Sequence, residues 1–243
     1  MGDYGLHPPP ASAHSPGPNP VPSSDPNEVS VLITGFGVVA YSSVRTAVPS
    51  ILEEYASAHG GRRPDIIIHM GIASMRRHFS VETRAHRDSY FISDVKGRSG
   101  YSDGERLWTQ LGLPPVLTPG SASEGSGSDV ADTPAVSLSA GKPQVCARAP
   151  DDRFLAAWRS FCPSDSDVRL SEDAGRYLCE FIFYTSLALA LQKGQDRNVV
   201  FFHVPALCGD EDIESGKEVT IALIKALVSC WIDESSVFAD GLS

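Results

Sequence analysis

The sequence predicts an α/β domain in which a mainly parallel mixed sheet is covered by helices on both faces. Short apolar segments alternate along the chain with segments of helical periodicity, which is typical of a parallel sheet. The segments 64–71 and 198–205 are almost continuously apolar, as expected for strands buried on both sides. With 243 residues, the chain is long enough for one such domain and too short for two large ones.

Two segments of low complexity set the expected limits of the domain. Residues 1–28 are rich in Pro and Ser and offer little apolar surface, so we expect a disordered tail. The Gly/Ser-rich stretch at about 119–144 is expected to be a surface insertion. Residues 29–243, with this insertion, are therefore expected to form a single domain.

Periodicity and turn residues place the elements between these limits. Strands are expected at 29–35, 64–71, 78–82, 168–171 and 198–205, and helices at 42–60, 102–112, 151–161, about 174–192 and 218–231. Ser102 or Asp103 is expected to cap the second helix, and Ser171 or Asp173 the fourth. Pro49 is expected to kink the first helix or to mark the start of its regular part.

Charge and apolar content exclude several classes of partner. The formal net charge is -10 and no block of Lys and Arg occurs, so the chain should repel nucleic acid and anionic membranes. No charged and apolar leader opens the chain, and its longest apolar run is too short to span a bilayer. We therefore expect a cytoplasmic protein without nucleic acid or membrane partners; the sequence does not indicate an oligomeric state.

The cysteines indicate free thiols rather than a disulfide framework or a zinc site. Their number is odd, their spacing is irregular and no C-x-x-C pair occurs. The five are Cys146, Cys162, Cys179, Cys208 and Cys230. No metal or organic cofactor is expected. The glycine turn "TGFG" also lacks the Lys-Ser/Thr of a phosphate loop and the third glycine of a dinucleotide turn, which disfavours a nucleotide site.

Cys179 is the candidate nucleophile. It falls near the start of the long apolar helix, where the helix dipole and free backbone amides favour a thiolate. The alternative is a small buried hydrophobic residue, the usual role of a cysteine in such a helix.

His203 and Glu82 are the candidate partners of this thiol. Glu82 ends its predicted strand and His203 lies near the end of its own, and ligand sites in open parallel sheets lie beyond the carboxyl ends of the strands. An imidazole at His203 could accept the thiol proton, and a carboxylate at Glu82 could orient it. The alternatives are a core histidine and a solvated surface glutamate. His69, at the end of another strand, is expected to be structural, and His78 and His86 are possible neighbours of the site.

Five motifs together resemble a known family. The segments "VLITGFG", "PDIIIHMG", "FSVETRAH", "SEDAGRYLCEFIFYTSL" and "VVFFHVP" occur in the order seen in the pyroglutamyl peptidase I family of cysteine peptidases. The resemblance runs from about Val31 to Trp231, without the Gly/Ser insertion, and is densest between Ser171 and Pro205.

This resemblance implies a three-layer α/β/α sandwich of the phosphorylase/hydrolase-like kind and removal of N-terminal pyroglutamyl residues from peptides. The family's triad maps onto Cys179, His203 and Glu82. Thiolate attack would give an acyl-enzyme that water releases, without a cofactor, and the backbone amide of Cys179 is the natural oxyanion donor. The resemblance also assigns substrate binding to Phe36, Tyr177 and Leu178.

The chain departs from the family pattern in two ways. Roughly 30 residues, about one strand and one helix, are missing between Gly37 and Tyr41, which should expose apolar surface and a strand edge. In addition, Arg87 and Glu180 stand where the family has other polar residues. The alternative function is therefore a catalytically compromised relative that binds a peptide or protein without turnover.

Overall fold

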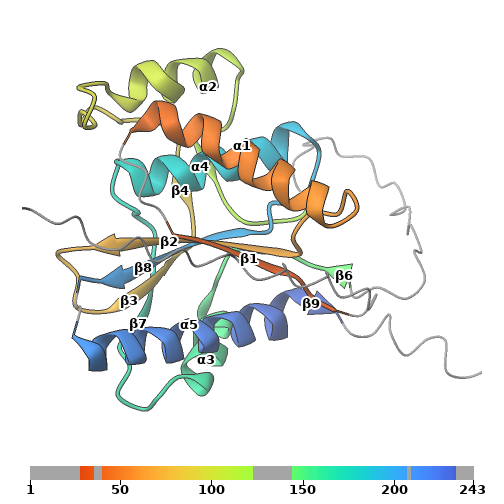
Figure 1. Cartoon of the computed structure of the whole chain (residues 1–243), viewed down its shortest axis with the longest axis vertical. Helices are drawn as coiled ribbons and strands as arrows, with labels where there is room; N and C mark the ends of the chain where they lie inside the picture. Colours follow the sequence, from red (N-terminus) through yellow and green to blue (C-terminus); the bar gives the residue numbers. More distant parts are fainter. Residues whose placement is uncertain (1–27, 36–39, 123–143, 207–208, 234–243) are drawn as a thin grey trace, which may run out of the picture.

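A five-stranded sheet forms the centre of the computed structural model, which describes residues 28–35, 40–122, 144–206 and 209–233 (Figure 1). The strand order is β1 (Val31–Gly35), β2 (Ile66–Ala73), β8 (Val199–Pro205), β3 (Phe79–Glu82) and β7 (Val168–Ser171). Neighbouring strands are parallel except β3 and β8, which run antiparallel. The predicted mainly parallel mixed sheet is thus confirmed.

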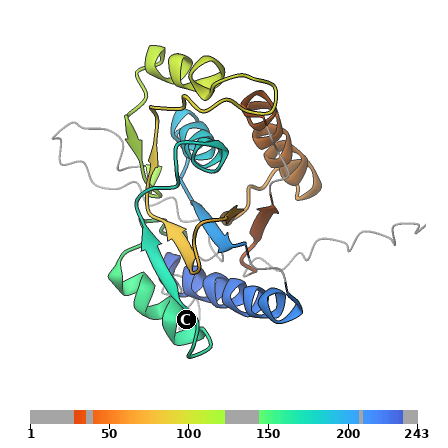
Figure 2. The same cartoon turned by 90° about the vertical axis from the view of Figure 1, so that its left-hand side faces the viewer.

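Helices cover both faces of this sheet. Helix α1 (Tyr41–Ala58), helix α4 (Leu178–Gln192) and the short α2 (Arg106–Gln110) lie on one face, and α3 (Asp152–Phe161) and α5 (Asp210–Trp231) lie on the other (Figures 1 and 2). Two small two-stranded antiparallel sheets also occur among the described residues. They pair β4 (Ala85–His86) with β5 (Val116–Leu117), and β6 (Gln144–Val145) with β9 (Ile232–Asp233). The fold is the three-layer α/β/α sandwich that the resemblance implies.

Alternation along the central strands divides the core into two clusters. Phe201 packs with α1 and α4, whereas Val200 and Phe202 pack with α3 and α5. The same period puts Ile67 in the first cluster and Ile66 and Ile68 in the second. Both faces of β2 and β8 are therefore buried, which explains why their sequences are continuously apolar.

Helix α4 is buried on nearly all sides but begins later than the sequence predicts. Its N-cap is Tyr177, so the predicted start near 174 with a cap at Ser171 or Asp173 is wrong. Gly175 and Arg176 have φ angles of 87° and 24°, in the left-handed region, so no right-handed helix passes through them. The late start puts Cys179 at the second helical position.

Three other predicted helix details change in the structure. Helix α5 begins at Asp210 rather than near 218, with an acidic first turn that suits the positive end of the helix dipole. The predicted helix 102–112 opens as a π-helix, Tyr101–Glu105, and its predicted caps are wrong: Asp103 instead binds Arg98. Pro49 lies inside α1 and does not mark its start.

Strand β1 lies at the edge of the sheet, where the shortened chain is expected to expose a strand. Among the described strands it pairs only with β2, and Ile33 is 40% exposed. Phe36 and Gly37 lie outside the described residues, as do the tail 1–27 and residues 123–143 of the insertion. No helix in the described ranges is both long and apolar enough to cross a membrane.

His69 ties the sheet to α4 as a neutral, buried imidazole. Its Nε2 is 2.6 Å from Ser186 Oγ on α4, and its Nδ1 is 2.6 Å from Thr34 Oγ1 on β1. Hydroxyl groups donate or accept as needed, so both ring nitrogens are satisfied without a charge. Burial lowers the pKa of His69 to about 3. The expected structural role of this residue therefore has a physical basis.

We predict that His69 makes the fold less stable as the pH falls. Below about pH 6.5 the His69 imidazole binds a proton in the unfolded chain but stays neutral in the folded chain. The unfolding free energy should therefore fall by about 1.4 kcal/mol per pH unit between pH 6.5 and 4.5. Urea unfolding of wild type and His69→Gln across this range measures the effect. The variant should show a flatter profile; equal slopes would contradict the assignment, since His78, whose pKa burial also lowers, is present in both proteins.

Candidate active site

Glu82 and His203 meet on the face of the sheet that α4 covers. Glu82 is the last residue of β3, His203 lies two residues before the end of β8, and the antiparallel pairing of the two strands sets Ser80 opposite His203. His203 Nδ1 donates to Glu82 Oε1 over 2.7 Å. The side chains are 4% and 0% exposed, respectively. The sequence-predicted pair is thus a buried imidazole-carboxylate contact, and Glu82 is not a solvated surface residue.

The Glu82 carboxylate is held in its charged form. Burial opposes ionisation, but the hydrogen bonds from His203, Ser171 and Arg76 outweigh it, and the pKa of Glu82 lies below its ordinary value. Arg76 Nη1 is 2.6 Å from the same Oε1 atom. An ionised carboxylate on Nδ1 orients the imidazole and leaves Nε2 for another partner.

Cys179 lies beside this pair at the start of α4. Its sulfur lies close to Gly71 on β2, because a Cβ added at Gly71 would be 3.1 Å from Cys179 Sγ. Gly71 is also the register partner of His203. The thiol therefore lies on the same face and at the same end of the sheet as His203. Among the described contacts, no hydrogen bond joins the two side chains.

The surroundings of Cys179 favour the thiol over the thiolate. Burial and, secondarily, the negative charge of Glu82 raise its pKa to about 11, although Arg76 acts in the opposite direction. Desolvation thus opposes the preference for a thiolate that is expected at a helix start.

The three predicted substrate-binding residues are only partly placed by the structure. Leu178 is 8% exposed and belongs to the core cluster under α1 and α4. Tyr177 is half-buried and packs edge-on against Tyr41, with ring centroids 5.7 Å apart. Phe36 lies outside the described residues. The contact of these side chains with a substrate stays a prediction.

Glu180, next to Cys179, is the centre of a second buried cluster that the sequence did not reveal. Its carboxylate is 0% exposed and accepts from His86 Nδ1 at 2.7 Å and from Arg176 Nη1 at 2.6 Å. The backbone amides of His86 and Arg176 also donate to it, each over 3.1 Å. Glu180 therefore fastens the loop before α4 to β4. Arg87 points elsewhere, to Asp88 and the Leu113 carbonyl.

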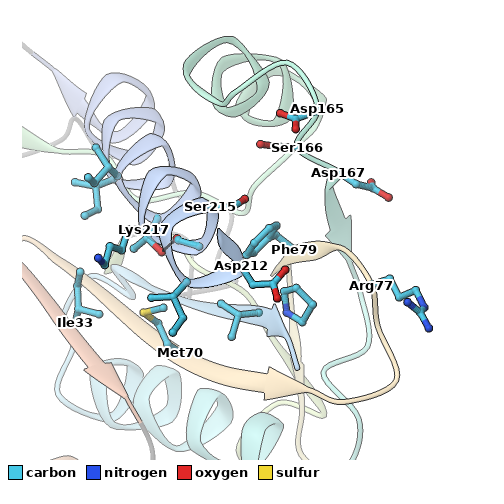
Figure 3. A pocket seen from close by; sticks show the side chains of 17 residues that line it. Ile33, Met70, Arg77, Phe79, Asp165, Ser166, Asp167, Asp212, Ser215 and Lys217 are labelled. Atoms are coloured by element: carbon cyan, nitrogen blue, oxygen red, sulfur yellow. Dashed lines mark hydrogen bonds between the residues drawn. The ribbon is translucent and has the colours of Figure 1, made fainter. Parts of the chain in front are cut away.

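A cavity of about 720 Å³ lies on the opposite face of the sheet (Figure 3). Met70, Phe79 and Ile33 form part of its lining under α5, and Arg77 stands at its edge. Cys179, His203 and Glu82 are not among its lining residues. We therefore place the candidate chemistry on the α4 face. In the described part of the chain, no group of three His, Cys, Asp or Glu residues could hold a metal ion.

Comparisons with known proteins agree with the motifs. No family model matches the chain. Pyroglutamyl-peptidase 1 of Rattus norvegicus and of Homo sapiens are each 26% identical over 169 residues. The match covers 70% of this chain but only 59% of either relative. The matched part thus spans less than two thirds of the curated relatives' length.

Solved structures with the same fold include a mutant pyrrolidone carboxyl peptidase from the hyperthermophile Pyrococcus furiosus. It has 18% sequence identity and a TM-score of 0.55, and the match covers 82% of this chain and 98% of that chain. This likeness establishes the fold. Together with the sequence matches, it confirms the resemblance that the ordered motifs indicated.

We predict that Gly71→Ala disturbs the candidate site. A Cβ at this position would lie 2.8 Å from the Phe201 ring and 3.1 Å from Cys179 Sγ, so the ring or the helix start must shift. Overpacking of this kind costs about 1–3 kcal/mol. Denaturant unfolding measures the loss, and mass spectrometry of the iodoacetamide-labelled peptide measures the reactivity of Cys179, which should fall.

Gly216→Ala on α5 is the matched control, because nothing lies within 4 Å of a Cβ there. In a helix interior this change should increase stability by up to about 1 kcal/mol and leave Cys179 labelling unaltered. If Gly71→Ala behaved like Gly216→Ala, the described closeness of Gly71 and Cys179 would be wrong.

Proposed function

We propose that this chain is a cysteine peptidase of the pyroglutamyl peptidase I type that hydrolyses N-terminal pyroglutamyl residues from peptides. In this proposal Cys179 is the nucleophile, His203 the general base and acid, and Glu82 the group that orients His203. The observation that carries it is the buried hydrogen bond between His203 and Glu82, with the Cys179 sulfur on the same face of the sheet. The pyroglutamyl preference rests on the names of the relatives.

In the first step, His203 Nε2 takes the thiol proton while the sulfur attacks the pyroglutamyl carbonyl carbon. Burial raises the thiol pKa to about 11, so in this scheme proton transfer accompanies attack. The carboxylate of Glu82 stabilises the imidazolium that forms. The negative charge on the carbonyl oxygen develops near the Cys179 amide, which as the second residue of α4 has no partner within the helix.

The imidazolium then returns its proton to the leaving amine. The C–N bond breaks, the peptide departs with a new N-terminus, and a thioester joins the pyroglutamyl group to Cys179. His203 next takes a proton from water, whose oxygen attacks the thioester carbonyl. Release of pyroglutamic acid and return of the proton to sulfur restore the resting thiol.

A second candidate function is a catalytically compromised relative that binds a peptide without turnover. The observation that favours it is a partly buried thiol with a raised pKa and, among the described contacts, no hydrogen bond to His203. Such a site should label slowly with thiol reagents near neutral pH even when a substrate analogue is present. Rapid labelling of Cys179 would count against it.

We predict that Cys179→Ala abolishes cleavage of a fluorogenic pyroglutamyl amide. No other described cysteine lies beside His203, so the loss should reach the background rate. Cys146→Ala is the matched control because Cys146 is an exposed thiol, and its loss should leave kcat/KM unchanged. Activity that survived in Cys179→Ala would refute the proposed nucleophile.

A further inference from the structure

Arg76, in the loop between β2 and β3, contacts two of the segments that build the candidate site. Its Nη1 donates to Glu82 Oε1 and to Ser80 Oγ, each over 2.6 Å. Its Nη2 donates to the backbone carbonyl of Asp173 over 2.7 Å. Asp173 belongs to the loop that enters α4 just before Cys179. One guanidinium thus joins the end of β3 to the loop before the nucleophile.

The contact with Glu82 differs from an ordinary surface ion pair. The carboxylate is fully buried and the Arg76 side chain is only 24% exposed, so water screens the pair weakly. Oε1 accepts from both Arg76 and His203, so Arg76 limits where this oxygen can lie and therefore how the imidazole is turned. Planar, multidentate geometry of this kind is available to arginine and not to lysine.

We propose that Arg76 is a positioning residue for the reaction: it fixes the Glu82 carboxylate under His203 and holds the loop before α4 at the distance that brings Cys179 to the imidazole. This inference deepens the proposed function and rests on it. Arg76 does not touch the reacting atoms in this scheme. It acts through Glu82 and through the Asp173 carbonyl.

Charge gives Arg76 a second effect on the thiol. The charged groups that act on Cys179 are Glu82, which raises the thiol pKa, and Arg76, which lowers it. Replacing Arg76 by a neutral residue leaves the Glu82 charge unbalanced beside the sulfur. The pH at which Cys179 becomes reactive should therefore rise.

The experiment compares Arg76→Met and Arg76→Lys with Arg77→Met in the full chain. Arg77 is the matched control, because it is the next residue of the same loop but is exposed and stands at the cavity on the other face (Figure 3). Circular dichroism and thermal melting establish that each variant is folded. The readouts are kcat and KM for a pyroglutamyl amide and the pH profile of Cys179 alkylation by iodoacetamide.

We expect kcat of Arg76→Met to fall about 10- to 100-fold with KM nearly unchanged, since the loss is one of alignment. Its alkylation profile should move to higher pH. Arg76→Lys should restore the profile, because it keeps the charge, but not kcat, because it loses the planar geometry. Arg77→Met should match wild type. A kcat and profile for Arg76→Met that equal those of Arg77→Met would overturn the proposal.

A double-mutant cycle separates positioning from general support of the fold. If Arg76 acts through Glu82, adding Arg76→Met to Glu82→Gln should cost much less than adding it to wild type. An equal loss in both backgrounds would contradict the proposal. If Arg76→Met alone does not fold, Arg76→Lys and the double variant, in which no buried carboxylate charge is left unpaired, still provide the comparison.

The two readouts, kcat and the alkylation profile, test the role of Arg76 separately from the proposed function. If wild type does not cleave pyroglutamyl amides, the function is wrong, but the alkylation profiles still report whether Arg76 tunes Cys179. If wild type cleaves them and the Arg76 variants keep both kcat and the wild-type profile, only the role of Arg76 is wrong.

Discussion

Complete burial of a charged carboxylate costs several kcal/mol unless charged or polar partners surround it. The Glu82 side chain is fully buried, so the fold has to supply such partners. His203 and Arg76 both donate to one of the Glu82 oxygens. The antiparallel pairing of β3 with β8 brings the imidazole to the carboxylate, and the β2–β3 loop brings the guanidinium. The one antiparallel pairing in the described central sheet therefore creates the contact on which the candidate chemistry depends.

The remaining geometry follows from alternation along the strands and from the late start of α4. Alternation sends His203 toward α4 and Phe202 toward α5, so the site and the cavity under α5 occupy different faces. The left-handed backbone at Gly175 and Arg176 delays α4 until Cys179 is its second residue. Glu180 then anchors the same turn through Arg176 and β4. Position, rather than a depressed pKa, makes Cys179 a candidate nucleophile.

Local patterns predicted the layers of this fold but not its long-range contacts. Apolar runs and helical periodicity located the central strands and most of α1 and α3, because the faces that an element buries determine where its apolar residues occur. The first turns of α5 are charged and contain Gly216, so they carry no apolar period. The start of α4 depends on a positive φ at Arg176, which residue type does not predict. Cys179, His203 and Glu82 were identifiable because they lie at or near the ends of elements. Arg76 and Glu180 act through contacts with loops and leave no comparable pattern.

In the proposed mechanism, Cys179 carries a pyroglutamyl group during turnover. Rapid acid quenching of the chain mixed with a pyroglutamyl ester, followed by peptide mass spectrometry, tests it most directly. We expect a mass increase of one pyroglutamyl acyl group on the peptide that contains Cys179, and this adduct should form more slowly when Glu82 is replaced by Gln. Turnover without any adduct on Cys179, or with the adduct on another cysteine, would contradict it.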